Sequence, residues 1–166
     1  MSEGWQQGIH DLLSRTRVSF LATVGKHGPE TSMAPFAIHH GNVLLHLSKL
    51  AKHTANIENH PHIGLMICTP EGSAASPLAL PRLSLQGEVT IVSAEQLESA
   101  KAAYLLQIPD AEQLFSFGDF RLFQFTPTHI NWVGGFGKAR IISPDQWRCL
   151  SRWKQSEFLY DGTAYF

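Results

Sequence analysis

Residues 18–48 read VSFLATVGKHGPETSMAPFAIHHGNVLLHLS, and this stretch decides the fold. Three apolar or β-branched runs, at 18–25, 30–38 and 42–48, are separated only by the short turn sequences KHGPE and HHGN. Short glycine-containing turns of this kind typically join the strands of β-hairpins. Pro35 falls inside the second run, which predicts an edge strand, a bulge or an opening of the ladder at that point. The stretch therefore predicts consecutive antiparallel strands.

The rest of the chain continues the pattern of many strands and few helices. Further strands are predicted at 62–69, 81–93 and 117–126, two short strands around a glycine-rich turn at 129–142, and helices at 5–15, about 51–60, 94–108 and around 144–153. Gly87 is expected to mark a bulge. Because strands and helices do not alternate regularly, we predict a mainly β fold, an antiparallel Greek-key barrel with helices packed at its ends. The prediction is one domain over residues 1–166, with a core at about 17–142.

Composition narrows the class of protein. The chain has 166 residues, 43% hydrophobic and 16% charged, which is typical of a compact domain. Its net charge of −1 gives no global attraction to nucleic acid or to anionic membranes, so we expect neither partner. The two cysteines lack paired spacing, no metal-ligand pattern occurs, and neither a signal peptide nor a membrane-spanning segment is visible. A cytoplasmic location is expected.

A local basic segment suggests an anion site. Residues 31–57 contain no aspartate or glutamate, and LSKLAKHTANIENHP (47–61) predicts a helix that begins with basic side chains and ends before Pro61. A helix N-terminus already carries about half a positive charge, so lysine there is unfavourable unless an anion is bound. The alternative is that Lys49, Lys52 and His53 are solvated surface charges.

Five segments in a fixed order carry a family resemblance. They are TSMAPF (31–36), LSKLAKHTANIENHP (47–61), RLSLQGEV (82–89), GDFRLFQFTP (118–127) and NWVGGFGKARI (131–141). Together they resemble the pyridoxamine-phosphate-oxidase-like FMN-binding split barrels, and most of all the short haem-utilisation branch of that family. The resemblance covers about residues 17–142. It implies a homodimer with two FMN molecules at the subunit interface, each held by both protomers.

The resemblance also implies a cofactor site. It places Ser32, Met33 and Ala34 beside the isoalloxazine ring, Ser48, Lys52 and His53 at the FMN phosphate, Arg82 on the next long strand, and Trp132 closing over the cofactor from the partner subunit. From the residues alone, Ser48 is predicted to be a helix N-cap, a role that is compatible with phosphate contact, and the alternative for Trp132 is a core residue.

Two departures from the family pattern bear on function. Pyridoxamine-phosphate oxidases carry an arginine–lysine pair where this chain has Lys52 and His53, and their C-terminal substrate-binding cluster is absent here. In the haem branch an aspartate matching Asp119 supports an iron-ligating histidine near the C-terminus, but this chain has no histidine after His129. We therefore expect Asp119 to make a strand-end hydrogen bond or a contact across the dimer.

The resulting functional prediction is an FMN-binding homodimeric flavoprotein, an oxidoreductase acting on an unknown small substrate. No side chain is a convincing general acid or base, so no catalytic residue is predicted and the flavin would supply the redox chemistry. Two alternatives stay open. One is a haem-binding or haem-degrading protein on the same scaffold, and the other is a binding module without a cofactor.

Overall fold

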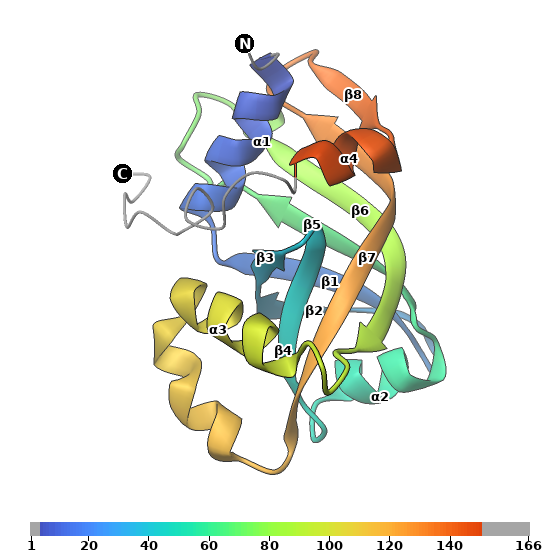
Figure 1. The fold of residues 1–166 in the computed structure, drawn as a ribbon. Coiled ribbons are helices and arrows are strands. Elements are labelled where there is room, and N and C mark those ends of the chain that lie inside the picture. Colours follow the sequence, from blue (N-terminus) through green and yellow to red (C-terminus); the bar gives the residue numbers. More distant parts are fainter. Residues whose placement is uncertain (1–3, 151–166) are drawn as a thin grey trace.

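The computed structural model describes residues 4–150, which form a single antiparallel sheet with helices around it (Figure 1). The strands are β1 (Val18–Gly25), β2 (Gly28–Pro35), β3 (Ala37–His39), β4 (Asn42–Ser48), β5 (His62–Cys68), β6 (Arg82–Ile91), β7 (Phe120–Val133) and β8 (Ala139–Ile142). Their order in the sheet is β2-β1-β5-β6-β7-β4-β3, and β8 pairs with β7. The mainly β, antiparallel prediction is confirmed.

Within residues 4–150, four α-helices and two short 3₁₀ segments surround the sheet. They are α1 (Gly4–Arg15), α2 (Lys52–Asn59), α3 (Leu97–Gln107), α4 (Pro144–Leu150), η1 (Pro77–Ala79) and η2 (Pro109–Ser116). The last predicted helix was expected to reach residue 153, and that extension and the tail lie outside the described residues. Among residues 4–150 no helix is long and apolar enough to cross a lipid bilayer. The cytoplasmic location stays a prediction.

The run predicted as one strand at 30–38 is two strands. β2 ends at Pro35, which has no N–H to donate to a ladder, and β3 begins two residues later. Between them the Phe36 N–H donates to the Arg17 carbonyl oxygen at 3.0 Å. β2 lies at the edge of the sheet, as the proline predicted.

The HHGN turn forms the predicted hairpin between β3 and β4. His40 and Gly41 both have positive φ, of 51° and 78°, which is the backbone that a two-residue hairpin turn requires. The indole N–H of Trp147 in α4 donates to the Gly41 carbonyl oxygen at 2.7 Å, so the C-terminal helix is attached to this turn.

The three strands predicted at 117–126 and 129–142 are two strands in the structure, and the first of them contains a bulge. They are β7, of 14 residues, followed by β8. Gln86 pairs with His129 and Gly87 with Pro127, so one residue of β7 is left over opposite the Gly87 position. A Cβ at Gly87 would overlap the Thr126 carbonyl oxygen, which explains the glycine.

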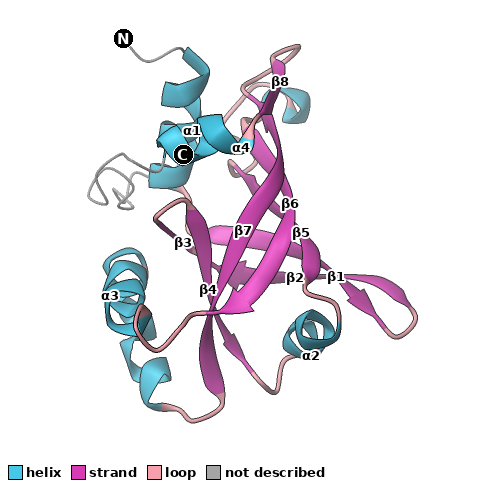
Figure 2. Cartoon of the chain, turned by 45° about the vertical axis from the view of Figure 1, so that its right-hand side comes forward, coloured by secondary structure: helices cyan, strands magenta, loops and turns pink. Residues whose placement is uncertain are grey.

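Two hydrophobic clusters lie on different sides of the sheet. The larger includes Ile9, Leu12 and Leu13 of α1 with the inner faces of the strands, and the smaller joins β3 and β4 to α3 through Ala100, Tyr104 and Ile108. Figures 1 and 2 show α2 and α3 on opposite sides of β4.

Candidate functional site

The start of α2 is built by the turn that follows β4. The residue before the helix is Ala51, and the helix has no side-chain cap. Ser48 instead donates its hydroxyl to Asp119 Oδ2 at 2.8 Å and accepts the Leu50 N–H at 3.1 Å. The N-cap interpretation of Ser48 is therefore wrong, and Asp119 makes a strand-end hydrogen bond, one of its two predicted roles.

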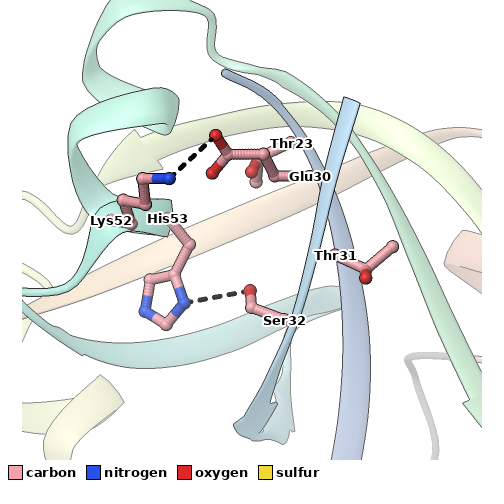
Figure 3. A pocket seen from close by; sticks show the side chains of 6 residues that line it. All are labelled: Thr23, Glu30, Thr31, Ser32, Lys52 and His53. Atoms are coloured by element: carbon pink, nitrogen blue, oxygen red, sulfur yellow. Dashed lines mark hydrogen bonds and ion pairs between the residues drawn. The ribbon is translucent and has the colours of Figure 1, made fainter. Parts of the chain in front are cut away.

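A pocket of about 540 Å³ opens beside this helix start. It is lined by Thr23, Glu30, Thr31, Ser32, Lys52 and His53 (Figure 3). Lys52 and His53 project from α2 toward Glu30 and Ser32 of β2, while the Thr31 side chain points to the other side of the strand. The structure thus brings together three predicted cofactor residues, Ser32, Lys52 and His53.

Glu30 joins the two elements that form the pocket. Its Oε1 lies 3.3 Å from the Lys52 Nζ, and its Oε2 accepts a hydrogen bond of 3.0 Å from the Asn56 Nδ2. Asn56 also donates to the Thr23 hydroxyl at 3.0 Å. The Asn56 hydrogen bond and then Lys52 lower the pKa of Glu30, so this carboxylate is ionised at neutral pH.

His53 is the other basic group of the pocket. Its Nδ1 lies 3.0 Å from the Ser32 hydroxyl. Burial lowers the pKa of His53 below its usual value, because desolvation disfavours the imidazolium. The ring is therefore neutral at pH 7, and where Nδ1–H donates to Ser32, the lone pair of Nε2 is available to a ligand.

The pocket carries less positive charge than the acid-free sequence of residues 31–57 predicted. Glu30 lies one position before the acid-free stretch, and its charge balances that of Lys52 while His53 is neutral. Sequence reasoning missed Glu30, Thr23 and Asn56. Two signals were present: the hairpin register places Glu30 opposite Thr23, and Asn56 follows Lys52 by four residues on one helix face.

The other predicted cofactor residues lie elsewhere in the chain. Ala34 is in the core, and Met33 is exposed on the opposite face of β2 from Ser32. The Arg82 guanidinium donates to the Leu80 carbonyl oxygen at 2.9 Å, at the end of β6 that pairs with Val133. Trp132 is 3% exposed and lies against Gly8 of α1.

The outward surface of β2, β1 and β5 forms a second feature, here called the outer face. Val18, Phe20, Met33 and Met66 on this face are between 39% and 55% exposed. Phe20 is paired with Met33 on one side and with Met66 on the other, so the three form a row across the strands. β2 separates this apolar row from the pocket, with Ser32 on one side and Met33 on the other.

Comparisons with known proteins place the chain in a family. The family model described as CREG, beta-barrel matches residues 10–148. The haem oxygenase HutZ of Vibrio cholerae is 30% identical over 131 residues, which cover 75% of this chain and 73% of that protein. A chloroplastic haem oxygenase, HOZ of Arabidopsis thaliana, is 31% identical over 117 residues, covering 69% of this chain but 35% of the plant protein.

A solved structure agrees with the fold. The structure of a haem-binding protein from Mycobacterium smegmatis matches with a TM-score of 0.81 at 24% identity, over 90% of this chain and 62% of that one. The resemblance drawn from the five segments is confirmed at the level of fold and family. This chain belongs to the CREG-type β-barrel family, which has the split-barrel fold.

Proposed function

We propose that this protein is a haem-binding protein of the haem-degrading class, which binds haem at the interface of a homodimer. The observation that carries the proposal is that a bacterial and a plant relative, 30% and 31% identical to this chain, are both haem oxygenases. The proposal promotes the haem alternative over the FMN flavoprotein. It extends to this chain an activity that belongs to the relatives.

The pocket offers polar groups that haem needs. Haem requires an axial ligand, an apolar surface for the macrocycle and polar or cationic groups near its propionates. His53 is neutral, and Ser32 orients its ring in the way that a hydrogen-bond partner orients metal-ligating histidines. Lys52 is 82% exposed at the pocket rim, within reach of a carboxylate. These residues fit the group.

Bound haem would supply iron for oxygen chemistry, and the chain would supply the surroundings. In this proposal His53 would hold the iron through Nε2, and Ser32 would orient the ring by accepting a hydrogen bond from Nδ1–H. Lys52 would donate to a propionate, and the partner subunit would supply the apolar surface for the macrocycle. The chain has no histidine after His129, so the C-terminal iron ligand of the haem branch is not among its residues.

A homodimer would cover the outer face. A contiguous row of exposed Phe20, Met33 and Met66 marks an association surface more often than a solvated one. A second copy of the chain would bury the row and bring its own side chains toward the pocket beyond β2. Light scattering after size-exclusion chromatography should give a dimer for the native chain and a monomer for Phe20→Glu. Leu106→Glu, at an exposed position of α3, is the matched control that should stay dimeric.

FMN is the second candidate. The start of α2 carries Lys52 and has no side-chain cap, which favours a phosphate at its N–H groups. The ionised Glu30 in the same pocket opposes a phosphate. The uncapped helix start therefore favours FMN, and the charge of Glu30 opposes it.

Absorbance titrations separate the candidates. We expect hemin to give a saturable Soret band with a 1:1 ratio per chain, and FMN to leave its fluorescence unchanged at tens of micromolar. Loss of that band on adding ascorbate and oxygen, with catalase present, would demonstrate haem degradation. Saturable FMN binding without a hemin-dependent band would reject the haem proposal in favour of the flavoprotein. A chain that binds neither would be a cofactor-free binding module.

A further inference from the structure

We propose that Glu30 determines which ligands the pocket accepts, because its pairing with Lys52 excludes phosphate dianions while admitting neutral or singly charged groups. The inference rests on the proposed function only in taking this pocket as the ligand site. It assigns a specificity-determining role to a residue outside the segment that carries the family resemblance at α2.

The carboxylate of Glu30 is held in place from several sides. Lys52 and Asn56 each engage one of its oxygens, at 3.3 and 3.0 Å, and Thr23 fixes the Asn56 amide. Gly25 provides the space, since a Cβ at that position would overlap the Glu30 side chain. The position of this charge is therefore defined by four neighbours on β1 and α2.

The charges of the pocket explain the exclusion. Lys52 and Glu30 cancel, and His53 adds no charge when neutral. A phosphate monoester carries a charge of about −1.5 to −2 at pH 7, against −1 for a carboxylate. Glu30 thus removes the attraction that Lys52 alone would exert, and because that attraction is proportional to the ligand charge, a phosphate loses up to about twice as much as a propionate. Haem would also gain affinity from iron ligation and ring burial, which Glu30 does not oppose.

The test is a double-mutant cycle with Glu30→Gln, Lys52→Gln and the double variant. Each is titrated with FMN and with riboflavin, the same ring system without the phosphate. We expect Glu30→Gln to bind FMN about tenfold more tightly than the native chain, as removal of one nearby charge predicts. Riboflavin affinity should not change, and the gain should disappear when Lys52 is also replaced.

Gly25→Ala tests the same idea without changing any charge. Its methyl group displaces the flexible end of Glu30, and Gly25 has an ordinary φ that alanine can adopt. We expect a several-fold tighter FMN complex, with an unchanged circular dichroism spectrum. The inference is overturned if both variants bind FMN no better than the native chain, or if riboflavin gains as much as FMN. Hemin binding by the native chain is a separate readout, so its absence would reject the proposed function alone.

Discussion

His46 and His53 come from the same acid-free segment, seven residues apart, and lie in opposite surroundings. His46 on β4 is 6% exposed, and its ring stacks on Phe115 with centroids 3.8 Å apart. Its Nδ1 has no hydrogen-bond partner among residues 4–150. His53, on the α2 side, shares a hydrogen bond with Ser32 and lines an open pocket.

The comparison separates a structural histidine from a functional candidate. Burial lowers the pKa of both, to about 4 for His46, so a neutral imidazole alone does not mark a site. For His46, Lys101 of α3 lowers the pKa further, and Phe115 and Tyr104 enclose the ring. What distinguishes His53 is an orienting hydroxyl together with access to a ligand.

The largest expected effect is a loss of folding stability at low pH. An unfolded histidine takes up a proton below about pH 6.5, whereas folded His46 does so only near pH 4. The unfolded state therefore binds more protons in that window, and the free energy of unfolding should fall as the pH drops, by up to about 3 kcal/mol from His46. Urea unfolding between pH 4 and 7.5 measures it.

His46→Phe keeps a ring against Phe115 and removes the titration. The unfolding free energy of the variant should decline less over the same range, because the His46 contribution is gone. Some decline should remain, since His53 and the carboxylates titrate in both proteins. Parallel curves for the native chain and the variant would show that His46 is not buried as a neutral ring, and the comparison would break.

The next effect concerns haem. If His53 ligates iron, His53→Ala removes a ligand, and we expect hemin to bind at least about ten- to a hundredfold more weakly, the range found when only a ligand's supporting residue is lost. His46→Phe should bind hemin like the native chain. A Soret band that survives His53→Ala and disappears in His46→Phe would reverse the assignment.

The smallest expected effect is on folding stability, when Lys52 in the pocket is replaced. Lys52→Gln breaks an ion pair whose lysine is 82% exposed, and such pairs contribute little to folding. We expect no measurable change in the urea midpoint, although ligand affinity should change. A clear loss of stability would mean that the pocket charges hold α2 to the sheet.

Local patterns predicted most of the fold. The apolar, β-branched run VSFLATVG, the HHGN turn and the proline after α2 each act within a few residues, and their structures agree. Gly87 likewise marked the irregular register between β6 and β7. These features follow from backbone preferences that neighbouring residues determine.

The site was harder to predict because its contacts join distant elements. Lys52 and His53 were expected at an anion site, but the charge that balances Lys52 comes from β2, 22 residues earlier. The resemblance gave positions for Arg82 and Trp132 that a single chain does not bring to the pocket. The periodicity of the sequence does not show that α1 covers Trp132, because that packing joins elements far apart in the chain.

Thr128 is the unpaired residue of β7, and we expect its deletion and its substitution to affect the fold very differently. Before Thr128 the side chains of β7 in the larger hydrophobic cluster are at odd positions, Phe123 and Phe125, and after it at even ones, Ile130 and Trp132. Thr128 itself is exposed. Replacing its side chain would disturb little, whereas losing the whole residue would turn Ile130 and Trp132 toward water. We therefore expect related chains to differ in the residue type at this position but not to lose the residue.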